Sequence, residues 1–170
     1  MEVYEAVRTV LAVRSYKEKA VPRDVIHRIV EAGWLTGSGM NSQPWNFIVV
    51  EDRDTLRRLG ALARTGPYVA QAPLAIVVAI EKTKFSVSDA SRAIQSMILT
   101  AWSEGVGSNW VGFLNLDEVK PLLGIPEDLE ALAIVPFGYP VQAVGKGQKQ
   151  RKPLSEVAHR GRFGNPFELG

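Results

Sequence analysis

A polar stretch at residues 38–46 leads abruptly into an apolar run at residues 47–50. Within the loop, Asn41 and Gln43 offer amide donors and acceptors, and glycine lets the backbone approach a ligand closely. A loop of this composition can hold a flat ligand with polar edges. Composition alone favours an ordinary helix-to-strand connection, because such connections are common. Trp45, at the entry into the expected strand, is expected in the core rather than against a ligand.

Four bases lie within seven residues near the carboxyl end of the chain, at Lys146, Lys149, Arg151 and Lys152. An arginine beside a lysine can give a phosphate both bidentate and point-charge contacts. The same cluster also suits a solvated loop or a weak nucleic-acid patch, and composition alone favours the solvated loop. Because the formal net charge of the chain is only +2, we expect no nucleic-acid partner.

The residues that usually carry acid–base or nucleophilic chemistry are scarce. The chain has no cysteine and two histidines, His27 and His159. Thiol nucleophiles, disulfides and thiolate metal sites are therefore excluded, and a multi-histidine metal site is not expected. The sequence contains no serine elbow, P-loop or dinucleotide-binding glycine fingerprint. We expect binding residues, no catalytic side chain and no metal.

Composition places the chain among ordinary globular proteins. Of its 170 residues, 46% are hydrophobic and 22% are charged, which suits one domain with a core. No apolar stretch approaches the length of a membrane span. Residues 1–5 carry acids where a signal peptide would carry bases. We therefore expect a cytoplasmic protein without a membrane partner.

Hydrophobic spacing predicts the elements that must position these residues. Helices are expected over 3–11, from Pro22 to Gly37, after Asp52, over 87–104 and after Asp117. Strands are expected over 47–50, 74–80 and 132–137, with a short strand or turn at 109–113. The continuously apolar run at 74–80 predicts a central strand that is covered on both faces. Together these elements predict one α+β (mixed α/β) domain over residues 1–170, with about four strands and helices on the faces of the sheet.

Side chains near helix ends add local predictions. Asp52 is placed to cap the helix that follows it. On that helix, Asp54 and Arg58 are spaced as an i,i+4 ion pair. Ser86 and Asp89 have the spacing of a capping box that opens the longest helix.

Four features together resemble the FMN-dependent nitroreductase family, and the resemblance runs over nearly the whole chain. Residues 41–45, Asn-Ser-Gln-Pro-Trp, resemble the family segment that lies over the flavin ring and ribityl chain. Arg14 matches a base that in the family faces the pyrimidine edge of the flavin. The stretch that begins at Lys149 resembles the family's carboxyl-terminal phosphate motif, which carries over onto Lys149 and Arg151. Residues 107–113 resemble the segment whose backbone amides approach flavin O4 and N5.

One departure from the family pattern concerns the phosphate. The family has Arg-Arg-Ser where this chain has Val10, Leu11 and Ala12, whose side chains cannot donate to a phosphate. We therefore expect Lys149 and Arg151 to carry most of the phosphate binding. The cofactor-binding residues that the resemblance implies are Val10, Leu11, Ala12, Arg14, Ser38, Gly39, Met40, Asn41, Gln43, Gln71, Trp110, Val111, Gly112, Lys149 and Arg151.

The resemblance also implies an architecture and an activity. The fold would have three layers, with a mostly antiparallel central sheet flanked by helices. Two chains would form an intertwined homodimer with FMN at each interface, and the tail at 141–170 would pack on the partner subunit. NAD(P)H would pass hydride through flavin N5 to a nitroaromatic, a quinone or a similar small acceptor.

Two alternatives remain open at this point. The same flavin scaffold also serves other acceptor chemistries, namely dehalogenation, dehydrogenation and flavin breakdown. Alternatively, the uncharged residues 10–12 indicate a dimeric small-ligand binding module that has lost tight FMN binding. Neither the preference for NADH or NADPH nor the physiological acceptor follows from the sequence.

Overall fold

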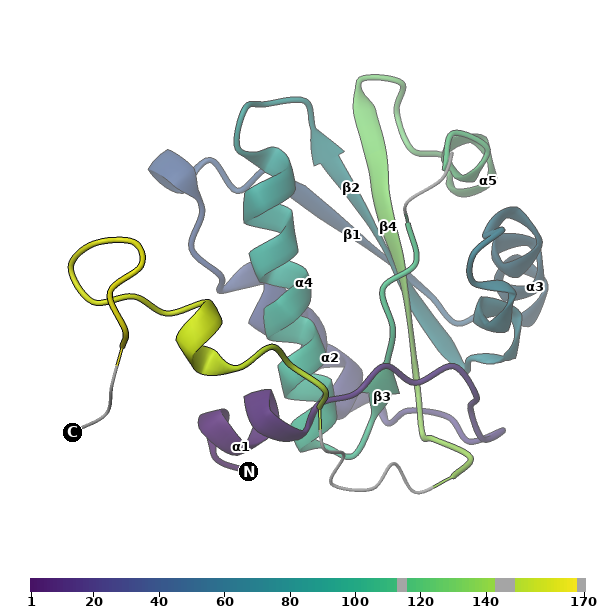
Figure 1. The fold of residues 1–170 in the computed structure, drawn as a ribbon. Helices are drawn as coiled ribbons and strands as arrows, with labels where there is room; N and C mark the ends of the chain where they lie inside the picture. The colour runs from purple at the N-terminus through teal and green to yellow at the C-terminus, as the bar shows by residue number, and fades with distance from the viewer. Residues whose placement is uncertain (113–115, 143–148, 168–170) are drawn as a thin grey trace.

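The computed structural model describes residues 1–112, 116–142 and 149–167. Its centre is a four-stranded antiparallel sheet with the strand order β1-β2-β4-β3 (Figure 1). The strands are β1 (Trp45–Val50), β2 (Leu74–Glu81), β3 (Gly107–Ser108) and β4 (Leu129–Gly138). Because β2 pairs with β1 on one side and β4 on the other, the prediction that 74–80 forms a central strand is confirmed.

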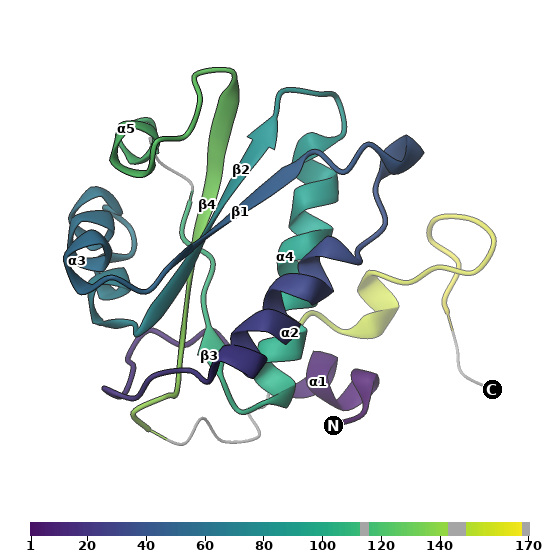
Figure 2. The same ribbon diagram turned by 180° about the vertical axis from the view of Figure 1, so that it is seen from behind.

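Helices cover both faces of this sheet. On one face lie α1 (Val3–Thr9), α2 (Arg23–Trp34) and α4 (Ser86–Ser103), and on the other lie α3 (Arg53–Leu62) and α5 (Val119–Leu123) (Figures 1 and 2). The predicted three-layer α+β fold, with a mostly antiparallel sheet flanked by helices, is therefore confirmed. None of the helices in the described part of the chain is long and apolar enough to cross a lipid bilayer.

The side chains of β2 alternate between two cores. Ile76 and Val78 pack in the core that α2 and α4 cover. Val77 and Ala79 pack in the core that α3 and α5 cover. All four are completely buried. A fully buried valine or isoleucine contributes about 1.5–3 kcal/mol relative to an exposed one, so this strand anchors both helix layers.

The helix-end predictions have mixed outcomes. The Asp52 carboxylate accepts from the Thr55 amide at 2.8 Å, so its capping role at α3 is confirmed. The predicted pairing of Asp54 with Arg58 is wrong, because Arg57 is the partner, at 2.7 Å. On this short helix the i,i+3 arginine reaches the carboxylate as readily as the i,i+4 arginine does.

The predicted capping box at α4 is also wrong. Phe85 is the N-cap of this helix, and it makes no side-chain capping hydrogen bond. The Ser86 hydroxyl instead accepts from the Thr83 amide at 2.9 Å. The Asp89 carboxylate points out of the helix and accepts from the backbone of Gly39, 50 residues away in the chain. A long-range partner has therefore replaced the local one.

Several element boundaries lie a few residues from their predicted positions. The helix α2 ends at Trp34 rather than at Gly37. β1 begins at Trp45, where the strand pairs with Ile80, and β4 begins at Leu129. Sheet pairing extends both strands beyond their apolar runs, since backbone hydrogen bonds do not depend on side-chain polarity.

Two predicted segments after α4 also change. The N-cap of α5 is Glu118 rather than Asp117, and no side-chain capping bond forms there. In the segment predicted at 109–113, Val111 makes one isolated bridge to Ile134 of β4. Phe113 lies outside the described residues.

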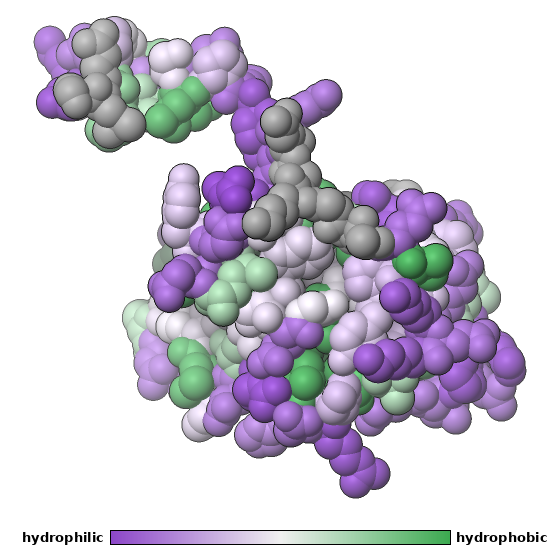
Figure 3. Space-filling model, turned by 90° about the horizontal axis from the view of Figure 1, so that it is seen from below, coloured by the Kyte–Doolittle hydropathy of each residue, from purple (hydrophilic) through white to green (hydrophobic). Residues whose placement is uncertain are grey.

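The carboxyl-terminal tail, residues 149–167, extends away from the body of the molecule (Figures 1 and 2). It contains one short 3₁₀ helix at Leu154–Glu156. A space-filling view shows the end of the tail standing apart from the body (Figure 3). Phe163 near that end is 92% exposed, and Val157 is also exposed. Large apolar side chains in such a position are typical of a surface that meets another protein.

Candidate functional site

The segment at residues 12–17 runs along the edge of the sheet beside β3. The Val13 amide donates to the Ser108 carbonyl at 2.9 Å. The Tyr16 side chain is buried, and its hydroxyl donates to the Val13 carbonyl at 2.6 Å. Burial raises the pKa of this hydroxyl, so it remains a donor throughout the physiological range. These bonds fix the backbone on both sides of Arg14.

Two glycines make room for this segment. A Cβ added at Gly107 would lie 2.4 Å from Cγ2 of Val13, much closer than two non-bonded carbons approach. A Cβ at Gly138 would lie 2.6 Å from the Pro73 ring and 2.9 Å from the Tyr16 ring. Both positions require glycine because another part of the chain occupies the space that a side chain would fill.

Arg14 is exposed on this edge. It lines a groove of about 290 Å³ between residues 12–15 and residues 140–142. Residues 10–12 precede it, at the carboxyl end of α1, where only the alanine is exposed. An exposed guanidinium in a shallow groove can meet an anionic or strongly polar edge of a ligand.

The two bases predicted to bind phosphate lie near the same helix end. The Lys149 ammonium donates to the Val7 carbonyl of α1 at 2.5 Å. Val7 is in the last turn of α1, whose carbonyls lack partners within the helix and carry partial negative charge. Arg151 is exposed two residues further on. Burial, together with the charge of Arg151, lowers the pKa of Lys149. Lys146, from the same basic cluster, lies outside the described residues.

The loop at residues 38–43 has an unusual backbone. Three of its residues, Met40, Asn41 and Gln43, have positive φ angles of 51°, 56° and 49°. A non-glycine residue in this region costs about 1–2 kcal/mol, and less for asparagine. Met40 is 90% exposed at the tip. The conformation persists only if the surroundings hold it.

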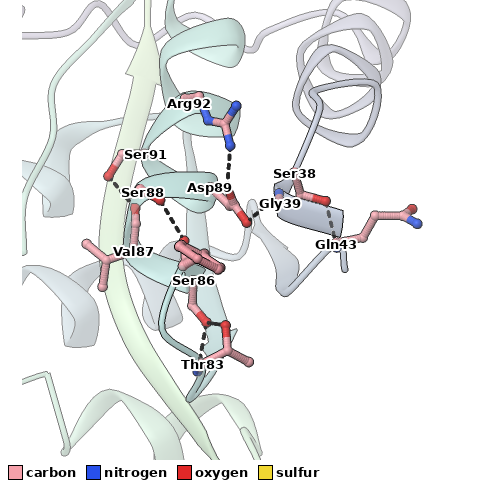
Figure 4. A network of polar contacts seen from close by, with 11 residues as sticks. Ser38, Gly39, Gln43, Thr83, Ser86, Val87, Ser88, Asp89, Ser91 and Arg92 are labelled. Atoms are coloured by element: carbon pink, nitrogen blue, oxygen red, sulfur yellow. Dashed lines mark hydrogen bonds and ion pairs between the residues drawn. The ribbon is translucent and has the colours of Figure 1, made fainter. Parts of the chain in front are cut away.

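Hydrogen bonds around the loop supply that support (Figure 4). The backbone amide of Gln43 donates to the Ser38 hydroxyl at 2.9 Å, which closes the loop on itself. The Gly39 amide donates to Asp89 of α4 at 3.0 Å. The carboxylate of Asp89 also pairs with Arg92 one turn along the helix. Asp89 is only 1% exposed, so this contact is largely shielded from water.

Trp45 follows the loop and confirms the prediction made for it. Its side chain is buried, and its ring stacks on that of Phe47 with 6.2 Å between the ring centroids. It therefore closes the base of the loop as part of the core.

The segment after α4 packs against β4. The Val111 amide donates to the Ile134 carbonyl at 2.9 Å, and the Ile134 amide donates back at 2.7 Å. A Cβ at Gly112 would lie 2.6 Å from the Leu132 carbonyl oxygen, so β4 itself requires glycine there. Because of the two bonds to Ile134, both backbone polar groups of Val111 are paired within the sheet. The indole nitrogen of Trp110 is buried and lacks a hydrogen-bond partner among the described residues.

Gln71 lies elsewhere on the surface. It is exposed and lines a groove of about 760 Å³ together with Lys17, Lys19 and Arg53. Arg53 is tied down there, because its guanidinium donates to the Ala72 carbonyl at 2.7 Å. The groove that Arg14 lines is a different one. No group of three or more acidic or histidine side chains in the described ranges is placed to hold a metal ion.

Apart from Gln71 and residues 110–112, the predicted binding residues form two groups at opposite ends of α4. The loop at 38–43 meets Asp89 in the first turn of this 18-residue helix. The carboxyl end of α1 meets the last turn, where the Trp102 indole donates to the Thr9 hydroxyl at 2.9 Å. At 1.5 Å per residue, these two contacts lie about 20 Å apart along the helix. Within one chain the loop and the α1 end are therefore separated along the length of α4.

Exposed apolar side chains concentrate on the α1, α2 and α4 side of the molecule and on the tail. Among the described residues, α3 and α5 contribute no large exposed apolar side chain. The helical layer and its connections expose Val3, Tyr4, Val7, Trp34, Leu35, Met40, Phe85 and Val87. An apolar surface of this extent is typical of a protein–protein interface.

Comparisons with known proteins identify the family and the fold of the chain. A family model described as the nitroreductase family matches residues 8–83 and 63–139. A protein of Methanothermobacter thermautotrophicus, named provisionally as an NADH dehydrogenase/NAD(P)H nitroreductase, is 34% identical over 154 residues, which are 85% of this chain and 81% of that protein. A crystal structure from Bacteroides thetaiotaomicron with the same provisional name has a TM-score of 0.86 at 28% identity, covering 95% of this chain and 98% of that one. An FMN-dependent nitroreductase of Clostridium difficile has a TM-score of 0.83 at 25% identity, covering 94% and 99% of the two chains.

Proposed function

Because the chain belongs to the nitroreductase family, we propose that it is an FMN-containing oxidoreductase that acts as a homodimer. Its electron donor is NADH or NADPH, and its acceptor is a nitroaromatic, a quinone or a similar small molecule. When bound, FMN supplies the redox chemistry by accepting hydride at N5 and passing it to the acceptor. The protein then needs to bind and orient the reactants, which suits a sequence with no cysteine and two histidines.

The observation that carries this proposal is the separation of the two binding groups along α4. Asn41 and Gln43 project beside the first turn, whereas Arg14, Lys149 and Arg151 lie toward the last turn. A single ligand meets both groups when the loop of one chain lies against the α1 end of a second chain. The site is therefore shared between subunits and is complete only in the dimer.

The side chains present fit FMN in this arrangement. Lys149 and Arg151 offer two cations to a phosphate, beside a helix end that by itself repels anions. Arg14 offers a cation to the pyrimidine edge of the ring, where negative charge develops on reduction. The exposed amides of Asn41 and Gln43 can hydrogen-bond to the ring and the ribityl chain. The tail at 149–167 packs on the partner, which covers its exposed apolar side chains.

A binding module without tight FMN is the second candidate, and the apolar residues Val10, Leu11 and Ala12 favour it. Colour distinguishes the two candidates. A yellow purified protein that releases FMN on denaturation supports the oxidoreductase. A colourless protein that does not take up excess FMN supports the binding module.

The phosphate role of Arg151 gives a direct test. We expect Arg151→Ala to weaken FMN about tenfold or more, as the loss of a charge-assisted hydrogen bond does, while riboflavin binding changes little. Lys152→Ala is the control, because it removes the same charge one residue away. If FMN and riboflavin weaken equally, Arg151 does not hold the phosphate.

Subunit sharing is tested by mixing two inactive variants. One variant carries Arg14→Ala with Arg151→Ala, and the other carries Asn41→Ala with Gln43→Ala. In a mixed dimer one site collects all four substitutions and the other collects none. A random mixture therefore regains about a quarter of the wild-type FMN sites, because half of its dimers are mixed. If mixing restores no site, each site lies within a single chain.

Colour changes of the FMN-loaded protein can identify the electron donor and the electron acceptor. Bleaching of the flavin colour under anaerobic conditions by NADH, by NADPH or by both identifies the donor. Recovery of the colour on addition of a nitroaromatic, a quinone or a halogenated phenol then ranks the acceptors, and the last of these tests dehalogenation. No bleaching by either nucleotide would exclude a nicotinamide donor.

A further inference from the structure

The loop at 38–43 is supported from outside by one buried carboxylate. Among the hydrogen bonds of the described residues, the one from the Gly39 amide to Asp89 alone joins this loop to another element. The remaining loop bonds, such as that from the Gln43 amide to the Ser38 hydroxyl, stay within the loop. Bonds inside the loop can preserve its shape, but only the bond to Asp89 fixes its position on α4.

Asp89 is well suited to this task. It is 1% exposed and lies in the first turn of α4, where the helix dipole favours negative charge. One oxygen accepts from Gly39 at 3.0 Å, and the other pairs with Arg92. Both oxygens therefore have partners, and the carboxylate cannot rotate without losing one of them (Figure 4).

Packing against the start of α4 limits the positions that the loop can adopt. A Cβ at Gly39 would lie 3.4 Å from the Phe85 ring and 3.6 Å from the Asp89 carboxylate, so the backbone rests directly on the start of α4. Of the residues that follow, Met40, Asn41 and Gln43 have positive φ, which they keep only under external constraint. Without the Asp89 acceptor, the Gly39 amide would lose its partner and the constraint would be relaxed.

We infer that Asp89 is a positioning residue for flavin binding, which acts by holding the loop in the position on α4 that presents Asn41 and Gln43 to the partner's flavin. This inference rests on the proposed function, since it assumes that the loop contacts the isoalloxazine ring and the ribityl chain. Asp89 itself does not touch the cofactor. Its effect on binding passes through the Gly39 amide.

The inference predicts a pattern that differs from that of the phosphate residues. Asp89→Leu removes the acceptor and is expected to weaken FMN and riboflavin by the same factor, about tenfold or more. Arg151→Ala, by contrast, is expected to weaken FMN alone. Asp89→Asn keeps an oxygen for the Gly39 amide and is expected to bind both flavins within about threefold of wild type.

The experiment measures flavin affinity by fluorescence quenching, and amide hydrogen exchange over residues 37–45. Asp89→Leu is expected to speed exchange in that loop while exchange in β2 stays unchanged. Ser88→Ala is the control, because this exposed residue is adjacent in the same turn and donates only to the Phe85 carbonyl. Asp89→Ala replaces the leucine variant if the latter does not fold.

Three results would overturn the inference. The first is normal flavin affinity in the apolar variants. The second is an Asp89→Asn variant as weak as Asp89→Leu, since that would make the charge, and not the acceptor, the cause. The third is failure of both apolar variants to fold, which would assign Asp89 to the body of the protein. If wild type binds no flavin, the proposed function fails instead, and loop exchange in the variants still reports whether Asp89 holds the loop.

Discussion

The contact between Gly107 and Val13 allows a quantitative test of how the sheet edge places Arg14. Substitution of Gly107 by alanine would place Cβ at 2.4, 2.8 and 3.1 Å from the three side-chain carbons of Val13. Val13 is 5% exposed and its amide is bonded to Ser108, so it has little freedom to move. A valine also has few accessible rotamers. The segment at 12–17 must therefore shift outward.

The expected magnitude follows from this geometry. Overpacking of this kind costs about 1–3 kcal/mol, and the short 2.4 Å contact favours the upper part of that range. Val13→Ala alone removes two buried methyl groups and is expected to cost about 1.5–3 kcal/mol. In the double variant the 2.4 and 3.1 Å contacts with the valine methyl carbons are removed, while the 2.8 Å contact with Cβ of residue 13 remains, so the strain is partly relieved. The double variant is therefore expected to be more stable than the sum of the single effects predicts, by about 1 kcal/mol or more.

The assay is urea unfolding of the flavin-free protein, at one fixed protein concentration because a dimer is expected. Flavin affinity provides a second readout. Gly107→Ala is expected to weaken both FMN and riboflavin, since Arg14 moves with the segment, and Val13→Ala in the same chain is expected to restore part of that loss. Strict additivity of the unfolding free energies would refute the reasoning, because it would show that the two residues do not share the contact.

Two further predictions concern pH. Burial lowers the pKa of Lys149, so FMN affinity is expected to fall as pH rises through a value below the ordinary lysine pKa of about 10.4. Riboflavin affinity is expected to stay level over the same range. Lys149→Arg should abolish the fall in FMN affinity, and an unchanged fall in that variant would exclude Lys149 as its cause. Hydrogen bonds from Thr55 lower the pKa of Asp52, so the stabilisation of α3 by Asp52 is present above the unfolded pKa of about 3.9 and is lost as pH falls through the lower folded pKa. The melting temperatures of wild type and Asp52→Ala should therefore differ at neutral pH and converge in acid. A constant difference between the two melting temperatures would contradict this assignment.

Local patterns in the sequence were sufficient to predict much of the fold. The run at 74–80 is continuously apolar because it is covered on both faces, and that alone predicts a central strand. Asp52 caps its helix through a residue three positions away, so the signal is local. In the same way Trp45 could be assigned to the core from its place at a strand start.

The other features of the fold and the site could not be predicted, because they depend on contacts between residues that are distant in the sequence. Asp89 has the spacing of a capping residue, but its partner Gly39 is 50 residues away, and no local pattern contains that information. The bond from Lys149 to the Val7 carbonyl spans 142 residues. The resemblance of this segment to a family motif implies a phosphate site, but only the fold brings Lys149 to the end of α1. The positive φ angles of the loop likewise follow from what holds it and not from the types of its residues.

The Lys149 contact also bears on how this chain manages without the arginines that its family has at positions 10 and 11. The last carbonyls of α1 carry partial negative charge, so a phosphate near residues 10–12 is disfavoured unless cations offset that charge. Lys149 offsets the charge of one of these carbonyls through its bond to Val7. To bind phosphate strongly, the ammonium must therefore serve both the carbonyl and the ligand, and a second charge raises its pKa back toward the ordinary value. FMN binding at alkaline pH is thus expected to take up a proton, and the proton uptake measured calorimetrically in two buffers should match the slope of FMN affinity against pH. An alkaline slope without proton uptake would show that another group responds to pH, and would leave Arg151 as the main phosphate contact.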